Sequence, residues 1–195
     1  MAGRPGRRES FAERRERRAA VDDPAVVLEA AARFLEVRSR SVSEVRRRLG
    51  GAGYQFALVE GAIARMTELG MLDDEAFART WVESRDRARP RGERAIREEL
   101  RTKGIDREII DLVLGERRDR ALASGEATSG EDGGEPASAD RAAAERLLAK
   151  NARALARVAD PRKRRQRAYG LLARHGFDPE TCREVAASVL EVPED

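Results

Sequence analysis

SVSEVRRRLGGAGY (residues 41–54), GERAIREELRTKGI (92–105) and RRQRAYGLLARHGF (164–177) share one pattern, and this pattern decides the fold. In each segment, a Leu is followed four residues later by a Gly and five residues later by a large apolar residue. The three sets are Leu49/Gly53/Tyr54, Leu100/Gly104/Ile105 and Leu172/Gly176/Phe177. A Gly just past a helix end can adopt the left-handed conformation, which brings the next apolar side chain onto the last helical turn. The pattern therefore predicts three helices that end in the same way.

The pattern recurs with a period of about fifty residues, which is typical of a helical repeat. A longer interval before the third copy is explained by SGEATSGEDGGEPASAD (124–140), which contains no large apolar residue and predicts a disordered acidic linker. Apolar residues six and ten positions after each Gly predict a further helix. We therefore expect an all-α protein: three tandem three-helix repeats stacked into an elongated, curved body.

Helix-start signals support this organisation. Asp23-Pro24, Asp160-Pro161 and Asp178-Pro179 each place an Asp cap before a Pro, and Ser41 with Glu44 fits a capping box. The predicted helices, nine in all and without any strand, cover 24–37, 42–51, 56–69, 74–88, 92–102, 107–122, 140–158, 161–174 and 179–190. The predicted domains are a disordered basic arm (1–22), repeat 1 (23–70), repeat 2 (71–122), the linker (123–139) and repeat 3 (140–192).

Arginine dominates the composition. Of 195 residues, 38% are charged, and the 39 basic residues include just three Lys, at 103, 150 and 163. Arg presents a planar fork of donors that suits phosphates and carboxylates. A genome of high G+C content would also inflate Arg, and composition alone leaves both explanations open.

Several classes of protein are excluded at this point. No apolar run is long enough to span a membrane, and the N-terminus has no apolar stretch typical of a secretory signal. A single Cys (Cys182) and a single His (His175) leave little for a metal site or a Ser-His-Asp arrangement. We expect a soluble, cytoplasmic protein that is not an enzyme and that needs no metal or cofactor.

The second repeat contains, in this order, Leu72-Asp73-Asp74, Phe77-Ala78, Arg85, Gly92, Ile96, Glu99-Leu100 and Lys103-Gly104-Ile105. This series closely resembles the signature of the RecX family. Residues 41–54 fit the same family, and residues 164–177 fit it more weakly, so the resemblance spans about residues 25–190 apart from the linker.

The resemblance implies a regulator of the recombinase RecA. Such proteins bind in the groove of the RecA–DNA filament, suppress ATP hydrolysis and strand exchange, and hinder filament growth. The implied partners are RecA, its nucleoprotein filament and DNA, without a membrane, and we expect a monomer. The basic arm and the linker lie outside the common core of the family.

Each repeat carries a basic cluster near its middle helix. Residues 38–48 hold five Arg against one Glu, 85–103 hold eight basic against four acidic residues, and 157–167 hold six basic residues against one Asp. Clusters that recur in stacked repeats predict a basic stripe for a phosphate backbone or an acidic groove. The candidate DNA- or RecA-binding residues are Arg38, Arg40, Arg46, Arg47, Arg48, Arg85, Arg87, Arg89, Arg91, Arg94, Arg97, Arg101, Lys103, Arg162, Lys163, Arg164, Arg165 and Arg167. The competing interpretation is a solvated surface with i,i+4 ion pairs, such as Glu93–Arg97.

The other candidate residues have structural interpretations. Phe77 and Trp81 lie one helical turn apart and are predicted in the core, whereas Tyr169 beside the third cluster is the candidate for base stacking. His175 fits the last turn of a helix, and Cys182 aligns with Val59 and Ile110 as a small buried residue.

Three functions remain open from the sequence. The first is a negative modulator of RecA. The second is a general DNA-binding protein of helical repeats without a dedicated RecA partner. The third is a helical adaptor for another protein, in which the Arg excess reflects the genome.

Overall fold

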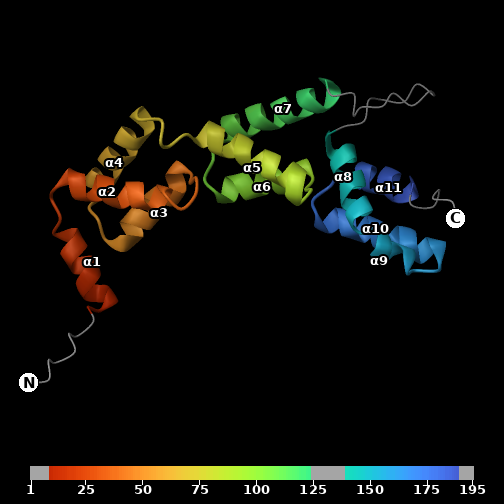
Figure 1. Ribbon diagram of the computed structural model, residues 1–195, viewed down its shortest axis with the longest axis horizontal. Helices are drawn as coiled ribbons and strands as arrows, with labels where there is room; N and C mark the ends of the chain where they lie inside the picture. The colour runs from red at the N-terminus through yellow and green to blue at the C-terminus, as the bar shows by residue number, and fades with distance from the viewer. Residues whose placement is uncertain (1–8, 124–138, 189–195) are drawn as a thin grey trace, which may run out of the picture. The chain divides into compact units, whose positions relative to one another are not determined.

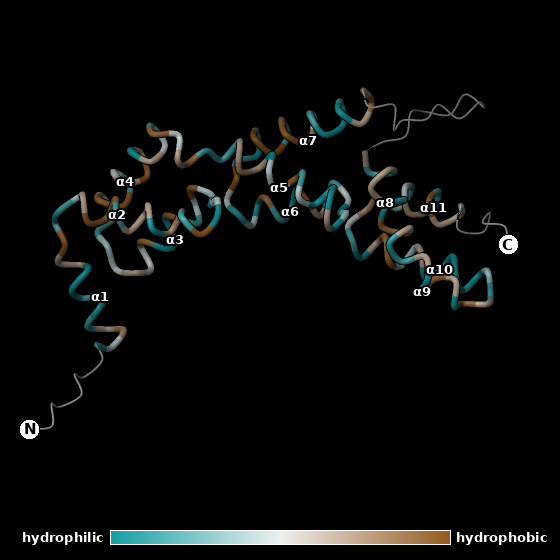
Figure 2. The backbone as a smooth tube through the Cα atoms, in the orientation of Figure 1, coloured by the Kyte–Doolittle hydropathy of each residue, from teal (hydrophilic) through white to brown (hydrophobic). Residues whose placement is uncertain are grey.

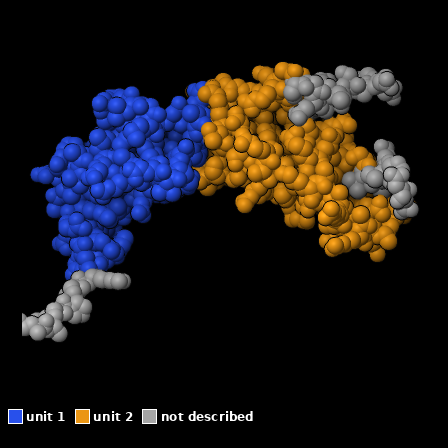
Figure 3. All heavy atoms as spheres, viewed as in Figure 1, with its two compact units in different colours: residues 1–77 blue, residues 78–195 orange. Residues whose placement is uncertain are grey.

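The computed structural model describes residues 9–123 and 139–188, which form eleven helices and no strand (Figure 1). The predicted all-α class of three-helix repeats is confirmed. The chain divides into two compact units, residues 1–77 and 78–195 (Figure 3). The division falls within helix α5, so the first unit contains repeat 1 and the first turn of repeat 2.

Repeat 1 consists of α2 (Pro24–Leu35), α3 (Val42–Ala52) and α4 (Phe56–Glu68). Its helices begin where the caps predict: Asp23 accepts the N–H of Ala25, and Ser41 forms a capping box with Glu44. Its core is aliphatic, and its buried members are Val27, Ala31, Val45, Leu49, Val59, Ala62, Ile63, Met66 and Leu72.

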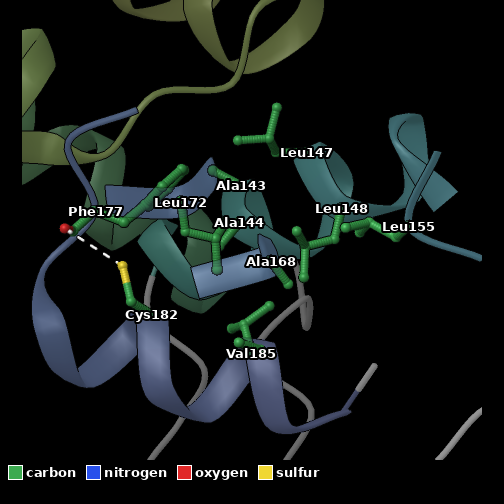
Figure 4. Packing of buried hydrophobic residues seen from close by; sticks show 11 residues of the cluster. Ala143, Ala144, Leu147, Leu148, Leu155, Ala168, Leu172, Phe177, Cys182 and Val185 are labelled. Carbon is green, nitrogen blue, oxygen red and sulfur yellow. Dashed lines mark hydrogen bonds between the residues drawn. The ribbon is translucent and has the colours of Figure 1, made fainter. Parts of the chain in front are cut away.

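Repeats 2 and 3 follow the same order of helices. Repeat 2 consists of α5 (Asp74–Ala88), α6 (Glu93–Thr102) and α7 (Arg107–Ala123), and repeat 3 of α8 (Ala139–Lys150), α9 (Ala152–Ala156), α10 (Pro161–Arg174) and α11 (Pro179–Ser188). The core of repeat 3 contains Leu147, Leu148, Leu172 and Val185 together with the small Ala168 (Figure 4). The middle helices of the three repeats are thus α3, α6 and α10.

The three middle helices end on the predicted glycine turn. Gly53, Gly104 and Gly176 have φ of 106°, 74° and 81°. The amide after each Gly donates to the carbonyl of the Leu: Tyr54 to Leu49 at 3.3 Å, Ile105 to Leu100 at 3.1 Å and Phe177 to Leu172 at 3.4 Å. These are the bonds of the Schellman motif, so the prediction from the repeated pattern is confirmed.

The N-terminal arm corrects one expectation. Residues 1–22 were predicted to be disordered, yet Phe11–Ala19 form helix α1; residues 1–8 lie outside the described part. A capping box between Ser10 and Glu13 begins the helix, a signal of the kind used at Ser41. Figure 2 shows α1 in mostly hydrophilic colours, and none of its residues is buried, so apolar periodicity could not reveal it.

The first helix of repeat 3 corrects a second expectation from the sequence. The single helix predicted over 140–158 is interrupted at Asn151, whose side-chain amide donates to the carbonyl of Leu147 at 2.8 Å. This break and α1 account for eleven helices in place of nine. The predicted linker, 123–139, lies outside the described residues except for its ends, Ala123 in α7 and Ala139 in α8.

Neighbouring repeats are joined by an aspartate that caps the preceding middle helix. Asp74, in the first turn of α5, accepts the N–H of Val42 at 2.9 Å. Asp140, in the first turn of α8, accepts the N–H of Glu93 at 2.9 Å, and Glu93 lies 51 residues after Val42. The first amides of a helix lack intrahelical hydrogen-bond partners. The aspartate of the next repeat therefore supplies an acceptor to the middle helix of the repeat before it. In α10, by contrast, Asp160 of the same repeat accepts the N–H of Arg162 at 2.8 Å.

A buried arginine reinforces the contact between repeats 2 and 3. Arg117 of α7 is 4% exposed and donates to Asp86 of α5 at 2.9 Å and to Asp140 of α8 at 2.6 Å. Burial opposes its charge, but the two carboxylates outweigh burial and raise the pKa of Arg117. In repeat 1, 51 positions earlier, the equivalent of Arg117 is Met66 and the equivalent of Asp86 is Leu35. Repeat 2 therefore uses an ionic group where repeat 1 uses an apolar contact.

Two glycines let the backbones of repeats 2 and 3 touch. Gly92 donates its N–H to the carbonyl of His175 at 3.1 Å. A Cβ on Gly92 would lie 2.3 Å from the carbonyl oxygen of Gly176, and a Cβ on Gly176 would lie 2.3 Å from the Cβ of Ala95. Gly176 thus ends α10 and also fits against α6.

Two glycine substitutions separate these roles. Gly70 ends α4 with a φ of 68°, and open space surrounds its Cβ position. We expect Gly70→Ala to lower the unfolding free energy by about 1 kcal/mol through backbone strain alone. Gly176→Ala adds a clash with Ala95, and a loss of about 2–4 kcal/mol is expected in urea denaturation. Equal losses in the two variants would contradict the close contact.

Replacing the buried arginine tests the ionic group. We expect Arg117→Met to lower the unfolding free energy by about 3–5 kcal/mol, because Asp86 and Asp140 would keep poorly solvated charges without their partner. The double variant Arg117→Met/Asp86→Leu copies Met66 and Leu35 of repeat 1 and should recover part of this loss. A double variant less stable than the single one, measured by the same denaturation, would refute this interpretation.

Candidate nucleic-acid interface

Six of the eighteen predicted binding residues have carboxylate partners within their own unit. Arg38 contacts Glu44, Arg101 contacts Glu98, and Arg85 and Arg91 share Glu99. Arg46 and Arg97 complete the group. These six arginines have acidic neighbours, as the competing interpretation of an ion-paired surface expects, and their role in binding stays a prediction.

Arg46 and Arg97 form the same ion pair in two repeats. Arg46 of α3 donates two hydrogen bonds to Glu60 of α4, at 2.6 and 2.8 Å. Arg97 of α6 contacts Asp111 of α7 across the same fourteen residues. Hydrogen bonding to the arginine lowers the pKa of Glu60 and of Asp111. We call this pair the repeat clamp, because it joins the middle helix to the third helix. Recurrence in register, which had suggested a binding stripe, reflects structure at this position.

Repeat 3 has no such pair at the equivalent position. The corresponding residues are Tyr169 and Arg183, also fourteen apart. Tyr169 is 36% exposed, and the Nε of Arg183 donates to the carbonyl of Pro179 at 3.0 Å. In repeats 1 and 2 an ion pair joins the middle helix to the third helix at this position. Repeat 3 instead has an accessible aromatic ring beside cations.

Nine predicted residues are exposed and have no carboxylate partner among the residues that the structure describes. We call them the open cations. They are Arg47 and Arg48 of α3, Arg87 of α5, Arg89 between α5 and α6, Arg94 of α6, and Arg162, Lys163, Arg165 and Arg167 of α10. Their positions along the middle helices differ from repeat to repeat. They remain the residues best able to bind phosphate, since their donors are not committed within the described fold.

The last three predicted residues have other contacts. The guanidinium of Arg40 lies 4.2 Å from the ring centre of Phe34, and Lys103 Nζ lies 4.8 Å from that of Trp81. Arg164 Nε donates to the carbonyl of Val158 at 3.0 Å. Each of these three side chains is thus held by a contact within the fold.

Trp81 corrects a further expectation. Phe77 is buried as predicted, but Trp81 is half-buried and its indole N–H donates to Glu99 at 2.8 Å. Arg85 lies 4.2 Å from its ring centre. Trp81 therefore organises the basic cluster of repeat 2 at the surface, because its polar N–H requires a partner that the aliphatic core does not offer.

The remaining candidates are structural. His175 caps the end of α10, with Nδ1 3.3 Å from the carbonyl of Pro90. Cys182 is fully buried and its Sγ contacts the carbonyl of Phe177 at 3.6 Å (Figure 4). Burial raises the pKa of the Cys182 thiol, which disfavours the reactive thiolate. Within the described residues, no cluster of His, Cys, Asp or Glu could hold a metal, and no helix could cross a membrane.

The chain is similar to known proteins over most of its length. Residues 73–114 match the model of the second three-helix domain of RecX, and residues 139–186 match that of the third. The protein named "Regulatory protein RecX" of Mycolicibacterium vanbaalenii is 32% identical over 164 residues, which cover 81% of this chain and 79% of that protein. The protein of the same name from Mycobacterium avium is 31% identical and covers 81% of both chains.

Solved structures support the fold. The crystal structure of RecX from Lactobacillus salivarius superposes with a TM-score of 0.67 at 18% identity, over 88% of this chain and 99% of the other. A second crystal structure, of a regulatory protein RecX, has a TM-score of 0.64 at 20% identity. With relatives above 30% identity over four-fifths of both sequences, and with the second and third domains in order, this chain belongs to the RecX family.

Proposed function

We propose that this protein is a negative modulator of the RecA recombinase. It binds in the groove of the RecA–DNA filament and suppresses ATP hydrolysis, filament extension and strand exchange during DNA repair and recombination. The observation that carries this proposal is the family relationship, which extends over four-fifths of the chain to proteins named as regulatory. The protein acts as a monomer in the cytoplasm, by binding rather than by catalysis.

The open cations support a contact with DNA in this activity. Arginine offers bidentate donors to phosphate oxygens, and binding to the backbone needs no particular base sequence. Four of the nine lie in the first half of α10, where Asp160 is the nearest acidic residue in the sequence. We propose that α10 is a principal contact to DNA and that it tolerates any sequence.

The first experiment is a titration of RecA. We expect the protein to inhibit single-strand-dependent ATP hydrolysis at amounts below one per RecA. The alternative is a general DNA-binding protein without a RecA partner, and the open cations alone would also be compatible with it. Measuring the binding of RecA in the absence of DNA distinguishes this alternative from the modulator. Unchanged hydrolysis throughout a wide titration would contradict the modulator proposal, and DNA binding without any RecA contact would favour the alternative.

Removing the cations of α10 tests its role. We expect Arg162→Gln/Lys163→Gln/Arg165→Gln/Arg167→Gln to weaken binding to single-stranded DNA and to reduce the slope of log K against log salt by about 0.7 for each phosphate that the variant no longer binds. A matched variant replaces four exposed arginines outside the predicted set: Arg33→Gln/Arg65→Gln/Arg107→Gln/Arg120→Gln. The same loss of affinity in both variants would show that net charge, and not α10, determines binding.

The exposed aromatic of repeat 3 supports a preference for single strands. Tyr169 lies beside Arg165, one helical turn earlier in α10, which combines a stacking surface with a phosphate donor. We expect Tyr169→Ala to weaken binding to oligo-dT about tenfold and binding to an abasic strand far less, with Tyr169→Phe close to wild type. Fluorescence anisotropy measures both.

The repeat clamp offers a second variant at the same position. Tyr169→Arg/Arg183→Glu copies the pair Arg46–Glu60 of repeat 1 and replaces a Tyr and an Arg by an Arg and a Glu. The net charge of the two positions falls from +1 to zero, so affinity for both strands should fall together through electrostatics. We expect this variant to fold and, in addition, to lose the preference for oligo-dT over the abasic strand. If the preference persists, Tyr169 does not stack on the bases.

A further inference from the structure

A hollow of about 440 Å³ lies among α1, α2 and α3 of the first unit. We call it the N-terminal hollow. Four arginines and two phenylalanines line it, Arg18, Arg40, Arg47, Arg48, Phe11 and Phe34, and Glu44 is the single carboxylate in its described lining. Among the described residues, its wall therefore carries a net charge of +3.

Helix α1 is held in place to complete the hollow. Gln55, at the start of α4, donates its side-chain amide to the carbonyls of Ala19 and Val21, both at 3.0 Å. A Cβ on Gly53 would lie 2.7 Å from the carbonyl oxygen of Arg15, so the glycine that ends α3 also admits α1. Arg18 then lies over the ring of Tyr54 and reaches the hollow from the α1 side.

The hollow contains an unsatisfied arginine. Arg40 is half-buried, with its guanidinium over Phe34, and its Nε is buried without a hydrogen-bond partner among the described residues. A buried donor of this kind lowers stability unless a ligand satisfies it. An unsatisfied donor that faces a hollow is typical of a ligand-binding residue, whereas a structural arginine has its donors paired within the fold.

The surrounding charges further destabilise the charged form of Arg40. Burial is the main factor that lowers the pKa of Arg40, and the positive charges of Arg38 and Arg48 add to it. Glu44 acts in the opposite direction, but its carboxylate accepts hydrogen bonds from Arg38 at 3.3 Å and from the N–H of Ser41 at 3.4 Å. An added anion would relieve the repulsion and supply the missing acceptor.

We propose that the N-terminal hollow binds a phosphate group. Arg40 donates through its buried Nε, Arg18, Arg47 and Arg48 surround the anion, and the rings of Phe34 and Phe11 offer an apolar surface for a base or sugar. A phosphate is preferred to a carboxylate because its several oxygens can accept from converging guanidinium groups. The inference deepens the proposed function, since Arg40, Arg47 and Arg48 belong to the proposed DNA- or RecA-binding set.

A melting experiment without RecA tests the site. In pyrophosphate at about ten times Kd, we expect the Tm of the full chain to rise by about 3 °C over chloride of equal ionic strength. Arg40→Gln should reduce that rise to below about one third. The same variant without phosphate should melt about 2–4 °C higher than wild type, because it removes a half-buried charge whose buried Nε has no hydrogen-bond acceptor among the described residues. A residue with a merely structural role would lower the Tm when replaced.

Two further variants keep the test decisive. Arg47→Gln/Arg48→Gln changes exposed side chains, so it should fold and also lose most of the rise in pyrophosphate. Arg65→Gln removes an exposed charge of α4 outside the hollow and should keep the full rise. An equal rise in wild type and Arg40→Gln, a lower Tm for Arg40→Gln without phosphate, or an equal rise in polyglutamate would overturn the proposal.

Competition identifies the source of the phosphate. If pyrophosphate displaces a labelled oligo-dT from the wild type but not from Arg40→Gln, the site takes a nucleic-acid phosphodiester. If the rise in Tm occurs without competition, it takes a free phosphate compound. Because RecA is absent from these assays, their failure leaves the ATP-hydrolysis titration unaffected, and the two proposals fail separately.

Discussion

A left-handed glycine at the end of each middle helix is the constraint on which the rest of this structure depends. Gly53, Gly104 and Gly176 turn the chain sharply, so that the following aromatic or aliphatic side chain covers the helix end and the third helix returns along the second. This return places residues fourteen apart opposite one another, where Arg46 meets Glu60 and Arg97 meets Asp111. Two of these glycines also admit a neighbouring helix: Gly53 admits α1 and Gly176 admits α6.

Local signals were therefore enough to predict the repeat. Caps, glycine turns and apolar spacing each depend on a few neighbouring residues, and they predicted the three middle helices and their ends. The same local reasoning failed at α1, whose capping box lies in a segment without a buried face, and at Asn151, where one side chain interrupts a helix of good apolar pattern. In both cases the deciding contact involves a polar side chain and not apolar periodicity.

The candidate site was less predictable, because a charge does not reveal its partner. Arg97 and Arg94 are equally basic in the sequence, but α7 brings Asp111 to the first, while the second is an open cation. Arg117 was not predicted to bind anything, yet it joins two repeats through Asp140, 23 residues away and beyond the linker. Only the tertiary fold distinguishes an arginine that holds the structure together from one that is available to a ligand.

This distinction changes the meaning of the arginine excess. Paired arginines at a protein surface add little to stability, and an unpaired buried one reduces it. If arginines served stability alone, Arg40 would have a carboxylate partner. The positions of Tyr169 and Arg183 would also hold an arginine and an acidic residue, as the equivalent positions of repeats 1 and 2 do. Repeat 3 departs from the clamp, and the N-terminal hollow holds a donor unsatisfied. The unsatisfied Nε of Arg40 marks a place where the fold gives up stability, and a bound phosphate is the partner whose chemistry would restore it.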